Sequence, residues 1–291
     1  MSIKLIAFDL DGTLLGSDGE VSAITCRVLH RAEQDGIRLV PATGRALPYF
    51  TKVRDALQLD RYPQNWVIAL NGAELHAYAQ GLTIRRHGIS PALTDKVVAL
   101  AGALDLEALC YTDDTRYRYQ PPDFEPRRRA YLIKNNLNFE ENIEHLMGSS
   151  ILLDTPHYTA EAEVQKVAFL HSSKRLTELL PTIRAALDPS LCAMLVTPCW
   201  LEIMPRTTNK GAALREIMRR CDLLPEEVAA FGDGENDIEM LKSALHGYAM
   251  KNAFPSVLAA APHLAPTNDE NGVAKVVCSL CGYDYSAFCP R

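Results

Sequence analysis

Short apolar runs alternate with amphipathic segments along the first part of the chain, and this alternation restricts the possible folds more than any other feature. The runs over residues 3–8, 37–42 and 66–70 are predicted to be buried strands, because each is short and ends in polar residues or glycine. Segment 20–34 has apolar residues at helical spacing and precedes Gly36, a typical residue just past a helix end. A second helical segment precedes the third run. Alternating strands and helices predict an α/β fold with a doubly wound parallel sheet.

The middle of the chain follows a different pattern. Ser90 and Pro91 are typical of a helix start. Strands separated by turns are predicted at 106–111, 116–119, 164–170 and 194–204, and a helix at 173–187. The alternating pattern returns after Pro205, with a helix over 210–220 and a strand over 228–231. We therefore expect a core of residues 1–84 and 205–291, into which an α+β domain of residues 85–204 is inserted.

The overall composition argues against several classes of protein. The formal net charge of the 291 residues is -6, and the longest basic run, Arg127–Arg129, is most simply a solvated face, so no nucleic-acid partner is expected. No apolar run reaches the roughly 18 residues of a membrane span, and residues 1–6 are typical of a strand rather than a signal peptide. We expect a soluble, cytoplasmic protein without a membrane partner, and no protein partner is implied.

The cysteines allow two interpretations. Cys278 and Cys281 form a Cys-x-x-Cys pair, and Cys289 follows near the C-terminus. A zinc site usually needs a fourth ligand, and His263 is the only histidine close in sequence. Free reduced thiols in a cytosolic protein are the interpretation we favour. The tail from Cys281 onward has no functional interpretation.

Polar residues follow three of the predicted strands. Asp9, Thr43 and Asn71 each lie just past the end of an apolar run. Ligands of open α/β sheets bind in the crevice outside the carboxyl ends of the strands. The sequence therefore predicts a binding site at this edge of the sheet, with Asn71 as a candidate for substrate contact.

The segment Asp9-Leu10-Asp11-Gly12-Thr13 ends the first predicted strand. Because the chain turns there, Asp9 and Asp11 can both face one pocket, where one carboxylate can attack as a nucleophile and the other can carry a proton. Taken alone, an ordinary turn with Gly12 in a left-handed conformation explains the segment equally well.

A second acidic segment, Gly232-Asp233-Gly234-Glu235-Asn236-Asp237, follows another predicted strand. Its spacing does not fit a calcium loop, but it fits Mg²⁺, which commonly binds one or two carboxylates, water and a substrate phosphate. Helix capping by Asp233 or Asn236 is the alternative, although capping alone does not explain three carboxylates in so short a segment.

Two further segments are suited to an anion. Lys210 lies at a predicted helix start, where a positive side chain is unfavourable unless it faces an anion; an ordinary surface lysine is the alternative. Thr43, Gly44 and Arg45 offer a hydroxyl and backbone N–H groups, which suit phosphate oxygens at a helix N-terminus. Arg45 is also a candidate for substrate contact, because it lies at a strand end.

The order of these segments resembles the haloacid dehalogenase-like (HAD) hydrolase superfamily. The resemblance rests on Asp9–Thr13, then Thr43, Lys210 and Gly232–Asp237. The inserted section and the phrases 201–205 and 267–274 resemble the Cof-type subfamily, which has a large α+β (type IIB) cap. The resemblance implies a Rossmann-like core with an inserted cap that closes over the site and selects the leaving group.

The resemblance also implies a role for each motif residue. Asp9 would be the nucleophile and Asp11 the acid and base. Thr43, Gly44, Lys210 and Asn236 would bind the phosphoryl oxygens. Mg²⁺ would be bound by Asp9, Asp233, Asp237 and the backbone carbonyl of Asp11.

The implied function is a Mg²⁺-dependent phosphatase that acts through an aspartyl-phosphate intermediate on small phosphorylated metabolites, such as sugar phosphates or phosphorylated cofactors. A phosphomutase, a catalytically silent binding protein and a hydrolase of a disaccharide phosphate are the alternatives.

The inserted domain offers further candidates for substrate contact, namely Arg116, Tyr117, Arg118, Tyr119 and His157. Each of them can also be a strand-surface or core residue.

Overall fold

A computed structural model describes residues 2–47, 50–113, 115–122, 150–197 and 199–289. The chain forms two compact units. The first unit contains residues 1–86 and 207–291, and the second contains residues 87–206. The first unit is therefore built from both ends of the chain, which flank the second unit in sequence.

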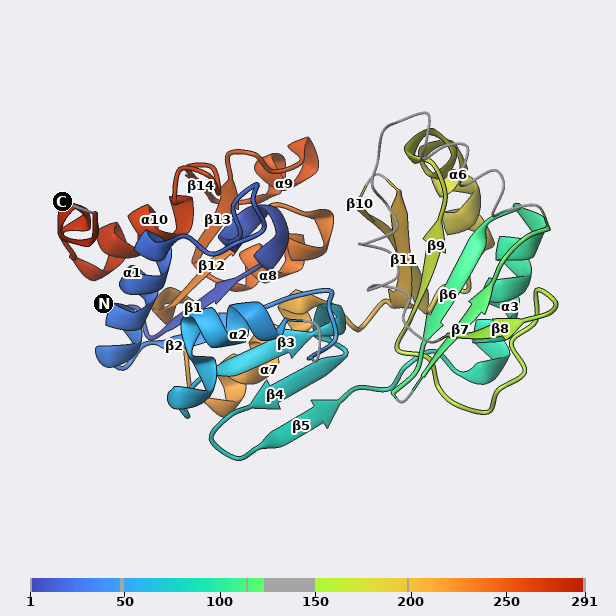
Figure 1. Cartoon of the computed structure of the whole chain (residues 1–291), viewed down its shortest axis with the longest axis horizontal. Helices are drawn as coiled ribbons and strands as arrows, with labels where there is room; N and C mark the ends of the chain where they lie inside the picture. Colours follow the sequence, from blue (N-terminus) through green and yellow to red (C-terminus); the bar gives the residue numbers. More distant parts are fainter. Residues whose placement is uncertain (1, 48–49, 114, 123–149, 198, 290–291) are drawn as a thin grey trace. The chain divides into compact units, whose positions relative to one another are not determined.

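The first unit contains a five-stranded parallel sheet with the order β14–β13–β12–β1–β2 (Figure 1). Its strands are β1 (Leu5–Phe8), β2 (Arg38–Pro41), β12 (Val228–Gly232), β13 (His246–Met250) and β14 (His263–Ala265). Strand β1 pairs with both β2 and β12, so segments from opposite ends of the chain become neighbours. Because all the pairings are parallel, the carboxyl ends of these strands lie at one edge of the sheet.

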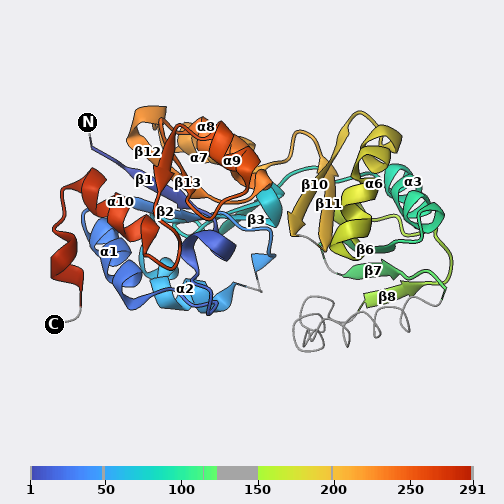
Figure 2. The same cartoon turned by 90° about the horizontal axis from the view of Figure 1, so that it is seen from above.

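Helices cover both faces of this sheet (Figure 2), because its strands are apolar on both sides. Ile6 and Phe8 of β1 belong to one apolar core, and Leu5 and Ala7 belong to the other. The helices of the first core are α1 (Ala23–Gln34), α2 (Thr51–Leu57) and α10 (Gly272–Cys281); those of the second are α7 (Lys210–Arg220), α8 (Ile238–Ser243) and α9 (Pro255–Ala260). The predicted doubly wound α/β fold is confirmed.

Helix α1 begins three residues later than its apolar spacing predicted. The side chain of Ser22 caps the helix by accepting a hydrogen bond from the backbone N–H of Thr25 (3.1 Å). Val21 lies outside the helix and forms a short antiparallel bridge with Leu15. A cap residue therefore moved the boundary that periodicity alone placed at Glu20.

The third predicted strand, β3 (Trp66–Ala69), lies beside the end of β2, where Ala42 and Ile68 form a parallel bridge and the backbone N–H of Thr43 donates to the carbonyl of Ile68 at 2.8 Å. Its regular pairing is antiparallel, with β4 (Glu74–Ala77), which in turn pairs with β5 (Leu82–Arg85). The predicted strand at 66–70 is present and meets the parallel sheet at this bridge, but the antiparallel hairpin that follows was not predicted.

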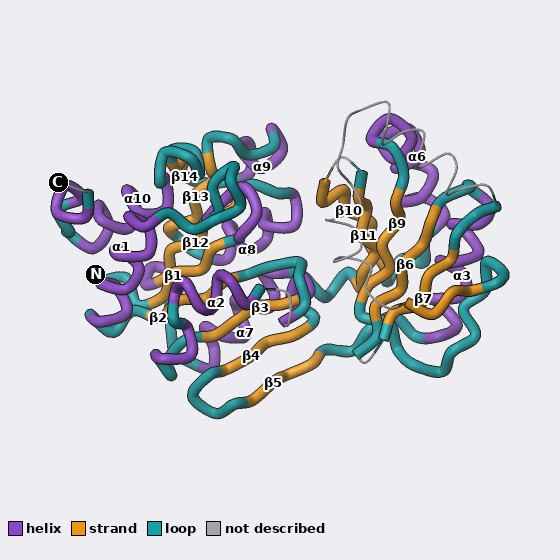
Figure 3. The backbone as a smooth tube through the Cα atoms, viewed as in Figure 1, coloured by secondary structure: helices purple, strands orange, loops and turns teal. Residues whose placement is uncertain are grey.

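Among the described residues, the second unit has a six-stranded sheet with the order β10–β11–β9–β6–β7–β8, in which only the β7–β8 pair is parallel (Figure 1). Its strands are β6 (Glu107–Tyr111), β7 (Arg116–Tyr119), β8 (Ser150–Leu153), β9 (Lys166–Leu170), β10 (Leu191–Thr197) and β11 (Trp200–Pro205). The strands from β10 to β7 can be followed as orange tubes in Figure 3. Helices α3 (Pro91–Ala103) and α6 (Ser173–Ala186) share its main apolar core. The α+β character predicted for this part of the chain is confirmed.

Candidate active site

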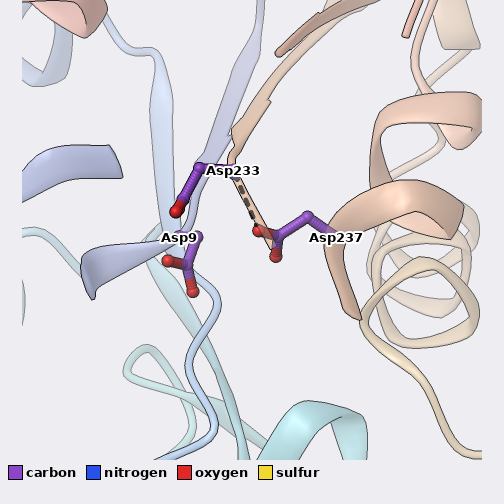
Figure 4. A group of neighbouring side chains, drawn as sticks. All are labelled: Asp9, Asp233 and Asp237. Carbon is purple, nitrogen blue, oxygen red and sulfur yellow. Dashed lines mark hydrogen bonds between the residues drawn. The ribbon is translucent and has the colours of Figure 1, made fainter. Parts of the chain in front are cut away.

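Three carboxylates meet at the carboxyl edge of the parallel sheet (Figure 4). Asp9 follows β1, Asp233 follows β12, and Asp237 directly precedes α8. One oxygen of each carboxylate lies within 4.8 Å of the others. Because β1 and β12 are neighbours in the sheet, strand order brings these side chains together.

Lys210 fixes two of these carboxylates. It is the first residue of α7 and is fully buried. Its Nζ donates hydrogen bonds to Asp9 Oδ1 and to Asp237 Oδ1, the latter at 2.6 Å. The sequence predicted that a lysine at a helix start would face an anion. The carboxylates of Asp9 and Asp237 are that anion.

Asp237 also orders the loop after β12. Its Oδ2 accepts a hydrogen bond from the backbone N–H of Asp233 at 3.0 Å (Figure 4), and another from the backbone N–H of Gly234 at 3.0 Å. Both oxygens of Asp237 are thus already hydrogen-bonded, one to Lys210 and one to the loop. This arrangement suits Asp237 to orient its neighbours.

The turn after β1 packs against Asp233. The hydroxyl of Thr13 donates to Asp233 Oδ1 at 2.7 Å. Gly12 has φ +82°, and a Cβ atom at this position would overlap Asp233 Oδ2. Only glycine combines this backbone conformation with so close an approach to the carboxylate.

The charges of this cluster fit a divalent cation. Three ionised carboxylates and the charge of Lys210 leave a formal charge of about -2 in a mostly buried site, which one Mg²⁺ would neutralise. Within the described part of the chain, Asp9 Oδ2 and Asp233 Oδ2 have no hydrogen-bond donor, and carboxylate oxygens are the ligands that Mg²⁺ prefers.

The pKa values reflect the same crowding of negative charge. Burial raises the pKa of Asp9 well above its usual value, and the charges of Asp237 and Asp233 raise it further, against the opposing effect of Lys210. Burial and Asp237 raise the pKa of Asp233 to about 6. Burial alone would lower the pKa of Lys210, but Asp237 and Asp9 outweigh it and raise that pKa. Lys210 is therefore charged, but its single positive charge does not balance the three carboxylates.

A cluster of polar backbone and amide groups lies beside the carboxylates. Thr43 is buried, and its carbonyl accepts from the backbone N–H of Asn71 at 2.9 Å. Asn71 Oδ1 accepts from Asn236 Nδ2 at 2.9 Å, and a Cβ atom on Gly44 would lie 3.3 Å from the Asn71 amide. The structure thus brings together Thr43, Gly44, Asn71 and Asn236 from three separate segments.

The helix N-terminus predicted around Thr43 was wrong. The backbone bends at residues 44–45, and the next helix with described bounds, α2, begins at Thr51. The backbone N–H of Arg45 donates to Thr43 Oγ1 at 3.0 Å, and its carbonyl accepts from the N–H of Leu70 at 3.1 Å. These contacts hold the loop against the turn after β3 in place of a helical turn.

Asp11 and Arg45 lie at the exposed side of the cluster. Arg45 Nη2 donates to Asp11 Oδ1 at 2.5 Å, and Arg45 Nε donates to Asp11 Oδ2 at 3.2 Å. The Asp11 side chain is 63 % exposed, whereas Asp9 is buried. The two aspartates of the first motif therefore have different partners: Asp9 contacts a lysine, and Asp11 contacts an arginine.

Two residues that sequence reasoning did not assign also shape the site. Thr13 orients Asp233, and Asn252 Nδ2 donates to the carbonyl of Gly12 at 2.7 Å. Thr13 lies inside the first motif. Asn252 follows β13 at the same edge of the sheet, so the rule about polar residues at strand ends could have found it.

The candidates in the second unit have structural partners. Arg116 lies over the ring of Tyr111, Arg118 pairs with Glu107, and the ring of Tyr117 packs edge-on against Tyr158. Tyr119 belongs to the apolar core, and His157 contacts Asp95 at 3.1 Å.

For three other sequence features, namely the basic run, the cysteines and the apolar segments, the described residues show no functional site. Arg127–Arg129 lie outside the described residues. All eight cysteines have free thiols, and Cys278 and Cys281 lie in α10. Among the helices of the described ranges, none is long and apolar enough to cross a membrane.

Comparison with known proteins finds similarity over nearly the whole chain. A family model described as haloacid dehalogenase-like hydrolase matches residues 6–277. The HMP-PP phosphatase of Cronobacter sakazakii is 29% identical over 261 residues, which cover 90% of this chain and 89% of that protein.

Solved structures are similar over a comparable length. BT1666 of Bacteroides thetaiotaomicron, described among phosphatases of the HAD enzyme superfamily, is 26% identical with a TM-score of 0.74, and the match covers 96% of this chain and 95% of that chain. BT4131, described as a HAD subclass IIB sugar phosphatase, is 22% identical with a TM-score of 0.74, covering 95% and 98%. At that identity, the second likeness shows a common fold only.

Proposed function

The chain belongs to the haloacid dehalogenase-like hydrolase family, as its motifs predicted, and from this premise we propose that it is a Mg²⁺-dependent phosphatase. Its proposed substrates are small phosphorylated metabolites, such as sugar phosphates or phosphorylated cofactors, hydrolysed through an aspartyl-phosphate. The observation that carries the proposal is the buried contact between Lys210 and Asp9 beside Asp233. The similarity to an HMP-PP phosphatase supports the substrate class.

In the first step, an oxygen of Asp9 attacks the phosphorus of the bound monoester. The Asp9 O–P bond forms while the P–O bond to the leaving group breaks, and the leaving oxygen takes a proton from Asp11. Lys210 orients Asp9 and offsets charge on the phosphoryl oxygens. Thr43, Gly44 and Asn236 are proposed to bind those oxygens.

In the second step, a water molecule attacks the phosphorus of the aspartyl-phosphate. The water O–P bond forms, the Asp9 O–P bond breaks, and the proton of the water passes to Asp11. Inorganic phosphate leaves and free Asp9 is restored. Because Asp11 gains the proton that it gave up in the first step, the cycle is balanced.

Asp9, Asp233 and the backbone carbonyl of Asp11 are proposed to hold Mg²⁺, with Asp237 in support. The ion would supply the positive charge that lets a phosphate dianion approach this acidic site. The second unit is proposed as a cap that selects the leaving group, with Asn71 as a substrate contact on the core. Phosphoryl transfer needs mainly positioning and charge stabilisation, which these residues can provide.

Phosphate release from p-nitrophenyl phosphate and a panel of sugar and cofactor phosphates tests the proposal. We expect turnover that requires Mg²⁺, stops with EDTA and is lost in Asp9→Asn. Asp60→Asn, which changes an exposed aspartate of the same unit, is the matched control and keeps full turnover. Release that persists in Asp9→Asn, or no release from any member of the panel, would contradict the proposal. Phosphoryl movement within a substrate, without free phosphate, would favour a mutase.

A further inference from the structure

Asp11 is the least constrained of the acidic side chains that the proposed function uses. Asp9 and Asp237 contact the buried Lys210, and Asp233 accepts from Thr13. Asp11 is mostly exposed, and its recorded side-chain partner among the described residues is Arg45. A carboxylate that must meet the leaving oxygen and then a water molecule needs a defined orientation.

Arg45 is well suited to supply that orientation. Its guanidinium contacts both oxygens of Asp11, a two-point contact that restricts rotation of the carboxylate. The backbone of Arg45 is itself fixed, because its N–H donates to Thr43 Oγ1 and its carbonyl accepts from Leu70. The orientation of Asp11 is thus connected to the loop that carries the proposed phosphate-binding Thr43.

The contact leaves Asp11 able to exchange a proton. Each carboxylate oxygen has two lone pairs, and Arg45 uses one on each. The ion pair is largely exposed, and such pairs contribute little to folding stability. A role in stabilising the fold is therefore a poor explanation for the two-point geometry.

We propose that Arg45 is a positioning residue that acts through Asp11, holding its carboxylate for the two proton transfers, rather than a residue that mainly binds the substrate. This inference rests on the proposed phosphatase function. It concerns most directly the second step, in which the water O–P bond forms, the Asp9 O–P bond breaks and the water proton passes to Asp11.

Stopped-flow release of p-nitrophenol from p-nitrophenyl phosphate, with excess Mg²⁺, tests the inference. In Arg45→Ala, we expect kcat and KM to fall together by about 10- to 100-fold and kcat/KM to stay within about twofold, because kcat/KM reports formation of the phosphoenzyme and kcat then reports its hydrolysis. A burst of p-nitrophenol is expected, because p-nitrophenolate leaves without a proton whereas phosphoenzyme hydrolysis still needs Asp11. Arg45→Lys keeps the charge but lacks the planar fork, and should remain impaired.

A double-mutant cycle separates positioning from direct binding. If Arg45 acts through Asp11, adding Arg45→Ala to Asp11→Asn changes burst and steady-state rates by less than about twofold. An undiminished effect of Arg45→Ala in that background, a raised KM with unchanged kcat, or full rescue by lysine would each overturn the inference.

The control and the readouts keep this test separate from that of the proposed function. Arg54→Ala removes another exposed ion pair of the same unit, with Asp55, and should leave kcat and KM unchanged. Failure of the phosphatase proposal would appear as wild-type protein without Mg²⁺-dependent release, or as release that survives Asp9→Asn. Failure of the positioning inference leaves both of those results intact.

Discussion

Lys210 has no exposed surface, although lysine is among the residues least often buried. Burial of a single charge is strongly unfavourable unless hydrogen-bonded partners of opposite charge accompany it. Asp9 and Asp237 provide those partners, and Asp237 is held in turn by the loop after β12. The proposed nucleophile is therefore positioned by a network of buried charges. Removing any one of these charges would leave another buried without its partner and would destabilise the fold.

Removal of the lysine charge should destabilise the fold as well as stop catalysis. We expect Lys210→Met to lower the free energy of unfolding by about 3 kcal/mol or more, because it leaves buried carboxylates without their cation. Urea denaturation measures the change. Lys242→Met, which alters a lysine whose side chain is 53% exposed, should change that free energy by less than about 0.5 kcal/mol. Equal effects of the two substitutions would contradict this account.

A second buried carboxyl group lies away from the candidate site. Glu33 of α1 is 2% exposed, and its Oε1 accepts from Asn65 Nδ2 at 2.6 Å. Within the described ranges, Glu33 Oε2 has no hydrogen-bond partner. Burial raises the pKa of Glu33 to about 7, against the opposing effect of the Asn65 hydrogen bond. The neutral carboxyl group is thus favoured in the folded protein below about this pH.

The raised pKa predicts that Glu33 makes stability fall as pH rises. Between its ordinary pKa of 4.5 and its folded value of about 7, the folded state binds the extra proton. The stabilisation is therefore complete below the lower value and is lost as pH passes the upper one, by up to about 3 kcal/mol. Urea midpoints from pH 5 to 8 should decline more steeply for wild type than for Glu33→Gln. Parallel curves would show that Glu33 does not cause the decline.

At the scale of elements, the position of Lys210 depends on how closely α7 approaches α8. Gly211 follows Lys210 in α7, and a Cβ atom there would overlap the backbone carbonyl of Glu239. The start of α7 is also capped, since Asn209 Oδ1 accepts from the N–H of Ala212 at 2.7 Å. A cap and a close helix contact therefore direct the lysine toward Asp9.

Gly211→Ala distinguishes packing from helix propensity, because the two effects have opposite signs. Propensity alone predicts a gain of up to about 1 kcal/mol for alanine inside a helix. The overlap with Glu239 predicts a loss of about 1–3 kcal/mol, because α7 must move away from α8. We expect the loss, together with a fall in kcat of about tenfold as Lys210 shifts. Thermal unfolding and p-nitrophenyl phosphate turnover measure both, and a stabilised, fully active variant would refute the packing argument.

At the scale of the whole molecule, the two units share no apolar core, and each contains one of the two tryptophans. Trp66 lies in the first unit and Trp200 in the second. The proposed Mg²⁺ ligands all belong to the first unit. A ligand that binds only folded protein raises the stability of the unit that binds it.

Mg²⁺ should therefore protect one unit selectively. Trp200→Phe leaves Trp66 as the fluorescence reporter of the first unit, and Trp66→Phe leaves Trp200 as the reporter of the second. We expect excess Mg²⁺ to raise the free energy of unfolding reported by Trp66 by about 2.7 kcal/mol at 100 times the dissociation constant, and to leave the value reported by Trp200 nearly unchanged. Asp233→Asn should weaken the shift. Equal shifts at both reporters would instead show that the units unfold together.

Local sequence patterns determined the order of strands and helices and the positions of the polar residues that follow them. Apolar spacing and length are properties of short segments, so the runs at 3–8 and 228–231 could be assigned as strands without knowing what they pair with. The parallel-sheet rule then placed Asp9 and Thr43 at one edge. The unfavourable position of Lys210 at a helix start similarly predicted an anion, but not which one.

Tertiary structure decided the partners. Lys210 and Asp9 are 201 residues apart in sequence, and they meet only because β1 lies beside β12. Arg45 and Asp11 are 34 residues apart, and they meet because β1 also pairs with β2. The antiparallel partner of β3, the strand β4, was likewise not predicted from the sequence. Hydrogen bonds and ion pairs between distant segments depend on strand order and register, which local periodicity does not encode.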